Sequence, residues 1–263
     1  MSEIQMTALV TGASGGIGEE LARLFADDGH NLVLVARSME KLVLLAGELG
    51  LGHNVAVRVI VSDLARPEAP REIFDELRAA GIEIDALVNN AGFGSYGLFA
   101  ETDERRELEL LQVNVVALTH LTKLFLPAMI ERRRGYVMNV ASTAAFQPGP
   151  LMAVYYASKA YVLSLSEALA NETRGIGVVV SALCPGPTAT NFVAAAGMER
   201  SKLFDRAVMD SRTVAEAGYR GMLAGERVVI PGFKNALVAR AVGFLPRGMV
   251  MNVVRGIQEK RAK

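Results

Sequence analysis

A serine, a tyrosine and a lysine stand at spacings that suit proton-transfer chemistry. Ser142 ends an apolar run, and Tyr155 and Lys159 follow it, four residues apart from each other. Residues four apart lie one above the other on a helix, so the lysine ammonium can lie beside the tyrosine phenol. A nearby cation favours the ionised form of a phenol, whose unperturbed pKa is about 10. The spacing therefore predicts that Tyr155 is a general acid–base group; the alternative is a solvated helix face without catalytic function.

A glycine-rich turn lies near the N-terminus, between a predicted strand and a predicted helix. Residues 11–18 read Thr-Gly-Ala-Ser-Gly-Gly-Ile-Gly. Glycines permit a tight turn and a close approach of backbone N–H groups to a pyrophosphate, and the helix N-terminus adds partial positive charge. Because the turn directly follows the first predicted strand, it predicts a dinucleotide-binding site.

The end of the second predicted strand carries Arg37 and Ser38. An NAD-specific protein of this architecture is expected to have an acidic residue there, to bind the ribose hydroxyls. A guanidinium instead pairs with a 2′-phosphate, and a hydroxyl can donate beside it. We therefore expect NADP(H) to be preferred over NAD(H). The alternative is that Arg37 is an ordinary solvated residue at a strand end.

The elements that position these residues follow from the pattern of the chain. Short apolar runs alternate with longer segments of helical period. The runs predict strands near Thr7–Thr11, Asn31–Ala36, Val55–Val61, Ala86–Asn89, Tyr136–Val140, Val178–Leu183 and Arg227–Ile230. Helices are expected near Ile17–Asp28, Met39–Leu49, Pro67–Ala80, Asp103–Ile130, Tyr155–Arg174 and Thr213–Ala224. Strands that are apolar throughout are typical of a parallel sheet covered on both faces. The prediction is a single doubly wound Rossmann-type α/β domain, with a mainly parallel seven-stranded sheet flanked by helices.

No repeat, low-complexity tract or linker divides this pattern. We predict a catalytic domain over residues 1–232 and a C-terminal extension over residues 233–263. The connection over about 188–212, after the sixth strand, is longer than usual. Because long connections at this edge of such a sheet often bind ligands, we expect it to be a substrate loop.

The composition limits the class of protein. Apolar residues make up 51% of the 263 residues, which is ample for a large core. The formal net charge is zero, so no strong field attracts polyanions, and we expect no nucleic-acid partner. Cys184 is the only cysteine, which excludes an intramolecular disulfide and suits a reducing cytosol.

The sequence shows no pattern typical of a targeting segment or of a metal site. No basic segment with an apolar signal core precedes the first predicted strand. No uninterrupted apolar stretch approaches the roughly 18 residues expected of a spanning helix. We therefore expect a soluble, cytoplasmic protein. His30, His53 and His120 are scattered without cysteine or carboxylate at ligand spacing, so we expect no metal site.

Together the glycine turn, the serine–tyrosine–lysine group and the alternating elements resemble the short-chain dehydrogenase/reductase family. The resemblance covers nearly the whole chain up to about Ile230. It also includes Asn-Asn-Ala-Gly at 89–92, Asn114 within Val-Asn-Val-Val-Ala, and Pro-Gly-Pro-Thr at 185–188. Six segments in the expected order are far more specific than any one of them. Ala36-Arg37 and Pro-Gly-Pro-Thr are similar to the NADP-preferring, broad-substrate reductase branch.

The resemblance implies a role for each matched residue. Tyr155 is expected to be the general acid of carbonyl reduction and the base of the reverse reaction. Lys159 is expected to lower the pKa of Tyr155 and to hold the nicotinamide ribose, and Ser142 to bind the substrate carbonyl. Asn114 is expected to hold a water that links Lys159 to solvent. The implied cofactor contacts, with Asp63 at the adenine and Thr188 at the carboxamide, are Gly12, Ser14, Gly16, Ile17, Gly18, Asp63, Asn90, Ala91, Gly92, Pro185, Gly186 and Thr188.

The predicted function is NADPH-dependent reduction of a carbonyl, reversible as an alcohol dehydrogenase. One alternative is a non-catalytic NADP(H)-binding regulator or scaffold, against which the complete set of four catalytic residues argues. An epimerase or dehydratase on the same fold is a further alternative. The family resemblance implies a homodimer or homotetramer that uses the helices over 103–130 and 155–174.

Apolar residues in the loops after the fourth, fifth and sixth strands are candidates for the substrate pocket: Phe93, Phe146, Leu151, Met152, Phe192 and Met198. Their character favours a lipophilic ketone or aldehyde over a sugar.

The C-terminal tail differs from the rest of the chain in its charge. From Lys234 to Lys263 there are seven basic residues and one acid, Glu259, among many apolar residues. We expect this basic amphipathic segment to cover the substrate pocket or a subunit interface. Contact with an anionic membrane is the less favoured alternative.

Overall fold

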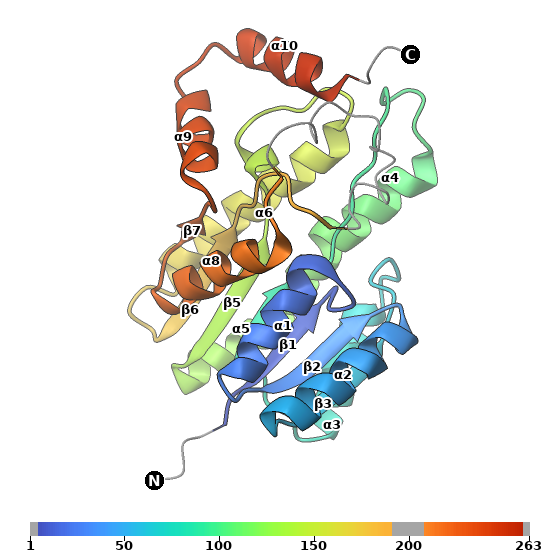
Figure 1. The fold of residues 1–263 in the computed structure, drawn as a ribbon, viewed down its shortest axis with the longest axis vertical. Coiled ribbons are helices and arrows are strands. Elements are labelled where there is room, and N and C mark those ends of the chain that lie inside the picture. Colours follow the sequence, from blue (N-terminus) through green and yellow to red (C-terminus); the bar gives the residue numbers. More distant parts are fainter. Residues whose placement is uncertain (1–4, 191–207, 260–263) are drawn as a thin grey trace.

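The computed structural model describes residues 5–190 and 208–259, and a parallel sheet lies at its centre (Figure 1). Seven strands are joined in the order β3-β2-β1-β4-β5-β6-β7, and every pairing is parallel. This confirms the predicted doubly wound Rossmann-type α/β fold. The strands are β1 (Thr7–Thr11), β2 (Asn31–Ala36), β3 (Val57–Val61), β4 (Ala86–Asn89), β5 (Gly135–Val140), β6 (Val178–Leu183) and β7 (Val228–Val229).

Helices cover both faces of the sheet. One face packs against α1 (Gly16–Asp27), α2 (Met39–His53) and α8 (Ser211–Leu223). The other packs against α3 (Ala69–Ala79) and α5 (Leu118–Arg132). The remaining described helices are α4 (Glu104–Leu111), α6 (Ala153–Glu172), α9 (Phe233–Val242) and α10 (Arg247–Gln258).

The strands are apolar throughout because both of their faces are buried. In β1, Ala8 and Val10 belong to the cluster under α1, whereas Leu9 belongs to the cluster under α3 and α5. Successive side chains of a strand point to opposite faces, so a strand covered on both sides needs apolar residues at every position. The core therefore fixes β1 and the turn that follows it.

The helix expected over 103–130 is interrupted. Between α4 and α5 the structure has one π-helical segment, η1 (Gln112–Ala117), which contains Asn114. A π-helical segment is a wider turn that often occurs at functional sites. Here the Asn114 side chain bonds to the backbone of Phe93 and to Ser158, which lie outside this helix. The interruption thus accompanies tertiary contacts that helical periodicity does not show.

Among the described residues, the helical stretch Glu104–Arg132 is long and apolar enough by composition to cross a membrane. The expectation from the sequence counted only uninterrupted apolar residues, so it missed this stretch. Half of its most apolar window is buried inside the fold. Leu121, Phe125 and Met129 pack in the core on the side of α5, which accounts for the apolar composition.

The sheet order reverses direction between β1 and β4. In open α/β sheets, ligands bind in the crevice beyond the carboxyl ends of the strands at such a reversal. Thr11, Ala36, Asn89, Val140 and Leu183 end their strands at this edge. Most of the predicted site residues follow directly after these strand ends.

The two C-terminal helices form an outer corner of the molecule, and α10 lies across the end near α6 (Figure 1). Val250 and Val254 of α10 are buried against Tyr155, Tyr156 and neighbouring residues. The C-terminal segment therefore packs against the end of the molecule that carries the tyrosines. The proposed boundary at residue 232 stays a prediction.

Candidate active site

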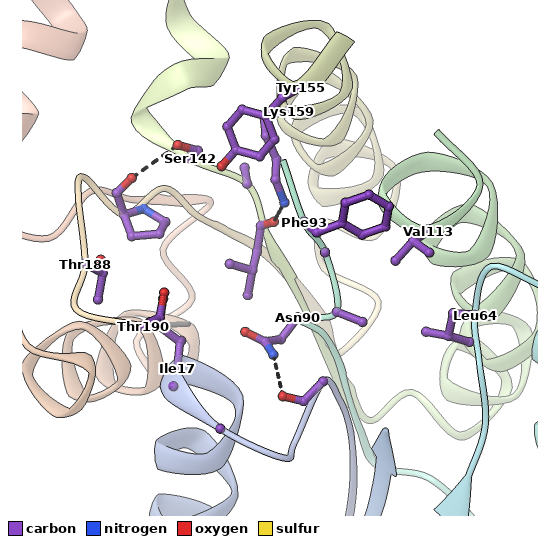
Figure 2. Close-up of a pocket in the computed structure, with 18 of the residues that line it drawn as sticks. Ile17, Leu64, Asn90, Phe93, Val113, Ser142, Tyr155, Lys159, Thr188 and Thr190 are labelled. Carbon is purple, nitrogen blue, oxygen red and sulfur yellow. Dashed lines mark hydrogen bonds between the residues drawn. The ribbon is translucent and has the colours of Figure 1, made fainter. Parts of the chain in front are cut away.

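A cavity of about 610 Å³ opens at the carboxyl edge of the sheet, a size suited to a small-molecule or cofactor site. The glycine turn lies at one end, with Ile17, Thr188 and Thr190 nearby, and Ser142, Tyr155 and Lys159 lie at the other (Figure 2). The predicted site residues that line it are Gly12, Ser14, Gly16, Ile17, Arg37, Ser38, Asp63, Asn90, Ala91, Gly92, Phe93, Ser142, Met152, Tyr155, Lys159, Pro185, Gly186 and Thr188.

The backbone of the glycine turn adopts conformations that other residues rarely take. Gly12 and Gly16 have φ angles of +66° and +60°. Helix α1 begins at Gly16, so its unpaired N–H groups and partial positive charge lie at the cavity wall. The turn can therefore hold the pyrophosphate of a dinucleotide.

The side chain of Asn90 fixes the glycine turn through two hydrogen bonds. Its side-chain Nδ2 donates to the carbonyls of Thr11, at 2.9 Å, and Gly12, at 3.2 Å. A Cβ atom on Gly18 would lie 2.3 Å from the same Nδ2. Gly18 is outside the cavity lining, and its lack of a side chain lets Asn90 pack closely; its contact with a cofactor stays a prediction.

Thr11 is a member of this arrangement that sequence reasoning missed. Its hydroxyl accepts hydrogen bonds from the backbone N–H groups of Asn90 and Ala91, each at 3.0 Å, and donates to the carbonyl of Val88. It joins the ends of β1 and β4 across the point where the sheet order reverses. A polar residue at the end of an otherwise apolar strand was the signal in the sequence.

Two cations stand at the far rim of the cavity. Arg37 and Lys41 both line it and are both exposed, beside Ser38 and Asp63. Lys41 was not predicted, although it follows Arg37 by four residues, about one helical turn. The Asp63 carboxylate accepts a hydrogen bond from the Ala65 N–H at 3.0 Å. These residues and the glycine turn line the part of the cavity that fits a dinucleotide.

The predicted catalytic group comes together at the opposite end. Figure 2 shows the Tyr155 hydroxyl directed toward Ser142. The Ser142 hydroxyl accepts from the Ala144 N–H at 3.1 Å, which caps a 3₁₀ turn, and donates to the Pro185 carbonyl at 3.4 Å. Ser142 thus caps this turn, and it also lines the cavity.

The pKa of Tyr155 differs from the expectation. Burial raises the pKa of this phenol, and the hydrogen bond with Ser142 lowers it by a smaller amount. The expected lowering by Lys159 is wrong for this structure: the Lys159 ammonium lies 5.9 Å from the centre of the Tyr155 ring and donates to the Val140 carbonyl at 2.7 Å. The loss of water around the buried hydroxyl is the larger effect.

Lys159 is buried, so its ammonium is shielded from water. The Val140 carbonyl accepts a hydrogen bond from it. Burial lowers the pKa of Lys159 to about 8, with a small opposing effect from Cys184. The ordinary value is 10.5, so the side chain loses its charge within the mildly alkaline range.

Asn114 is buried beside this group rather than in the cavity wall. Its Oδ1 accepts from the Phe93 N–H at 3.1 Å, and its Nδ2 donates to the Phe93 carbonyl and to the Ser158 hydroxyl. A Cβ atom on Gly92 would lie 3.0 Å from Asn114 Oδ1 and 3.4 Å from Lys159 Nζ. The amide and the ammonium therefore flank the same glycine, and the relay between them stays a prediction.

The substrate candidates divide into three groups. Phe93 and Met152 line the cavity. Phe146 and Leu151 are not among the residues that line it, so their contact with a substrate stays a prediction. Phe146 packs against the cluster that contains Leu118 and Val162, on another side of the 3₁₀ turn. Leu151 takes a left-handed backbone conformation, and its carbonyl accepts from Gly97. Phe192 and Met198 lie outside the described residues.

A contact from the C-terminus closes the tyrosine end. Gln258 is fully buried, and its Nε2 donates to the Tyr156 hydroxyl at 2.5 Å. The Tyr96 hydroxyl donates to the Gln258 backbone carbonyl at 2.7 Å. Tyr156 lines the cavity and meets Tyr155 edge to face at 6.1 Å. Gln258 thus joins α6, α10 and the loop after β4, a contact that no sequence motif predicts.

The comparisons with known proteins agree with this geometry. Residues 6–201 match the family model for short chain dehydrogenase. The chain therefore belongs to the short-chain dehydrogenase family, a class of nicotinamide-dependent oxidoreductases.

Three similar proteins illustrate the range. The very-long-chain 3-oxoacyl-CoA reductase of Anas platyrhynchos is 32% identical over 257 residues, covering 94% of this chain and 78% of that protein. A short-chain dehydrogenase from Sphingobium yanoikuyae, solved in complex with NADPH, is 33% identical with a TM-score of 0.83 and covers 98% of both chains. The bulky-bulky ketone specific alcohol dehydrogenase from Comamonas testosteroni is 31% identical with a TM-score of 0.80, covering 99% of this chain and 98% of that one.

Proposed function

We propose that this protein is an NADPH-dependent reductase of apolar ketones or aldehydes, which also catalyses the reverse oxidation of the alcohol. The observation that carries the proposal is the convergence of the Ser142 and Tyr155 hydroxyls on the cavity that the glycine turn enters. A dinucleotide held by the turn would lie in this same cavity, and its nicotinamide would supply the reducing equivalents when bound.

The chain's own residues supply the proton and the orientation. In the proposed reaction, Ser142 donates a hydrogen bond to the substrate oxygen and stabilises the charge that develops on it. Tyr155 gives its proton to that oxygen. Lys159 provides a cation beside the phenol, and Asn114 connects this cation to the water that replenishes the proton.

The pKa directions suit the reduction. Because burial raises the pKa of Tyr155, the phenol is protonated at neutral pH and can act as an acid. Because the pKa of Lys159 is about 8, the ammonium is present at neutral pH and is lost in mildly alkaline solution. Turnover in the reductive direction should therefore fall as the pH rises through about 8.

The preference for NADPH rests on Arg37 and Lys41. Both cations stand at the rim of the cavity beside Ser38, where a 2′-phosphate is bound in this architecture. Arg37→Asp should reduce the ratio of kcat/KM for NADPH to that for NADH at least about tenfold, the typical value of a charge-assisted bond. Lys41→Ala should change the ratio in the same direction. An unchanged ratio in Arg37→Asp would refute the preference.

The substrate class rests on the lining near Tyr155. Phe93, Val113, Ala144, Met152 and Tyr156 present mostly apolar surface there. Arg106 lies with its guanidinium carbon 4.0 Å from the centre of the Phe93 ring, so polar groups stand at the edge of this apolar area. The similar proteins named for 3-oxoacyl-CoA and for bulky ketones support a lipophilic carbonyl compound.

The experiment follows NADPH oxidation by absorbance against a panel of apolar ketones, aldehydes and quinones. Tyr155→Phe should lose at least about 100-fold in turnover, the usual contribution of a general acid. Tyr156→Phe is the matched control: its hydroxyl bonds to Gln258, so kcat should stay near that of wild type even where KM for bulky ketones rises. Tight NADPH binding without turnover on any substrate would instead favour a non-catalytic regulator. Product formation without net NADPH consumption would favour an epimerase or dehydratase.

We also propose that the protein is a cytoplasmic homo-oligomer, a dimer or tetramer. Val116 and Tyr161 are 47% and 41% exposed on the predicted helix faces of η1 and α6. Light scattering coupled to size exclusion tests the assembly, and a monomer at micromolar concentration would refute it.

A further inference from the structure

Helix α9 and the turn after it carry an apolar stripe on the outside of the molecule. Phe233, Leu237 and Val238 are 82%, 59% and 59% exposed, and Phe244 is 90% exposed. Phe233 and Leu237 are four residues apart and lie on one side of α9, Val238 follows Leu237, and Phe244 lies in the turn two residues after the helix ends. Isolated exposed apolar residues are ordinary, but a contiguous patch of large ones indicates a surface that meets another phase or molecule.

The charges around this stripe have one sign. Residues 233–258 contain Lys234, Arg240, Arg247 and Arg255, all exposed, and no acidic residue. Arg255 pairs with Glu259 at 3.5 Å. No ion pair holds the other three cations within the part of the chain that the structure describes. The stripe is therefore bordered by positive charge that is available to an external partner.

The opposite sides of the same helices are attached to the protein. In α10, Val250, Val254 and Gln258 are buried, and Gln258 is tied to Tyr156 and Tyr96. In α9, Asn235 donates to the Pro231 carbonyl at 2.9 Å, and Ala239 is buried. The helix pair thus has an inner side that packs on the site and an outer side that presents the stripe, at the corner of the molecule in Figure 1.

We propose that α9 and the turn into α10 dock on the surface of an anionic lipid bilayer. An amphipathic helix with cations beside large apolar side chains lies in the membrane interface, where the apolar residues enter the acyl region and the cations meet anionic headgroups. A second copy of this chain suits the surface less well. Pairing two of these stripes brings like charges together without an acid to separate them.

Docking of this kind is peripheral and leaves the fold unchanged. It places the C-terminal helix pair, whose α10 packs against Tyr156 of the cavity wall, next to the bilayer. A lipophilic carbonyl compound dissolved in the bilayer would then reach the cavity over a short path. Only this last consequence rests on the proposed function; the docking itself does not.

The test is co-sedimentation of the full-length protein with vesicles, which needs no substrate. Wild type should sediment with phosphatidylcholine vesicles that contain phosphatidylglycerol, and much less with pure phosphatidylcholine. Phe244→Ser should weaken binding at least about tenfold, because it removes a whole inserted side chain. Arg240→Glu changes the charge by two and should weaken binding roughly 25-fold at low salt.

Two matched controls exclude a general effect of surface changes. Leu51→Ser removes an apolar side chain that is 92% exposed on α2, away from α9, and should bind like wild type. Arg78→Glu reverses a charge on α3, where the arginine side chain is 75% exposed, and should also bind like wild type. Light scattering of Phe244→Ser should give the mass of wild type, and NADPH binding should be unchanged.

Each contrary result overturns the proposal. Wild type that stays in the supernatant with anionic vesicles refutes docking, and so does equal sedimentation of wild type, Phe244→Ser and Arg240→Glu. A lower mass of Phe244→Ser, together with absent lipid binding of wild type, assigns the stripe to contact between copies of this chain. Failure of the carbonyl reductase assay leaves vesicle binding unaffected, so the two proposals fail separately.

Discussion

The glycine turn and the C-terminal helix pair form two sides of one site but are built differently. A Cβ atom on Gly18 would lie 2.3 Å from Asn90 Nδ2 and 2.5 Å from the Gly12 carbonyl oxygen. In α10, Cβ atoms on Gly248 and Gly256 would meet nothing within 4 Å. The cofactor side is therefore close-packed backbone on the edge of a buried sheet, whereas the other side is a pair of helices with much of their surface exposed.

We infer from this difference that the two regions have separate roles, the first in cofactor binding and the second in substrate binding. The position of a bound cofactor would depend on the glycine turn. This turn cannot move without displacing the ends of β1 and β4, to which it is joined. The tyrosine end depends on α10, which a few buried side chains and Gln258 hold in place. The match to the family model covers residues 6–201 and so includes the first region and excludes α9 and α10. We therefore expect changes in the first region to abolish cofactor binding, and changes in the second to alter substrate use.

The largest expected effect is that of Gly18→Val. The added side chain clashes with Asn90 and with the Gly12 backbone, so the turn and the start of α1 must shift. We expect a loss of about 3 kcal/mol or more in the free energy of unfolding, as for overpacked core sites. NADPH binding should weaken at least about 100-fold, because the displaced turn no longer presents its backbone N–H groups to the pyrophosphate. Urea denaturation and fluorescence titration measure both. Near-native binding would show that the turn is less constrained than its contacts indicate.

A second prediction concerns Lys159→Met. The buried ammonium costs stability below pH 8, because its pKa is lowered from 10.5 to about 8 on folding. Between these values the unfolded chain binds more protons than the folded one, so the stability of wild type rises with pH. Lys159→Met should therefore be about 2 kcal/mol more stable than wild type at pH 7, with the lost bond to Val140 included, and nearly inactive.

The pH dependence is the check on that prediction. The stability advantage of Lys159→Met should shrink from pH 8 upward and vanish by about pH 10.5, in denaturation of the cofactor-free proteins. A constant difference across this range would mean that the burial of the ammonium has no part in it.

A third prediction addresses the C-terminal side through Gln258→Leu. The change removes the hydrogen bond to the Tyr156 hydroxyl and leaves that hydroxyl buried without this donor. We expect KM for bulky ketones to rise about tenfold, with a loss of about 1–2 kcal/mol in stability, typical of a removed buried hydrogen bond. The affinity for NADPH should stay constant. Steady-state kinetics with small and bulky ketones measure the effect, and an equal change in NADPH affinity would break the separation of the two regions.

The smallest expected effect is that of Gly256→Ala. The new methyl group enters open space in a helix interior, so stability should rise by about 0.5–1 kcal/mol. The kinetic constants should not change. A loss of stability here would indicate that α10 packs more closely than its contacts show.

The two regions also differ in what could be predicted from the sequence. The strands, the glycine turn and the pairing of Tyr155 with Lys159 follow from local period and spacing, and the structure contains them. The bond between Gln258 and Tyr156 joins residues 102 apart in sequence, so no local pattern contains it. Phe146 was assigned to the cavity by its loop alone, but its direction depends on how the 3₁₀ turn packs. The π-helical turn at Asn114 was missed for the same reason, because tertiary contacts decide it.

The proposed carbonyl reduction is tested most directly by following the hydrogen that the cofactor gives up. NADPH that carries deuterium at the transferred position is incubated with the best ketone of the panel, and the alcohol is analysed by mass spectrometry. We predict one deuterium on the carbinol carbon with wild type and almost none with Tyr155→Phe. Alcohol without deuterium, or equal transfer by Tyr155→Phe, would contradict the proposed reduction with Tyr155 as its acid.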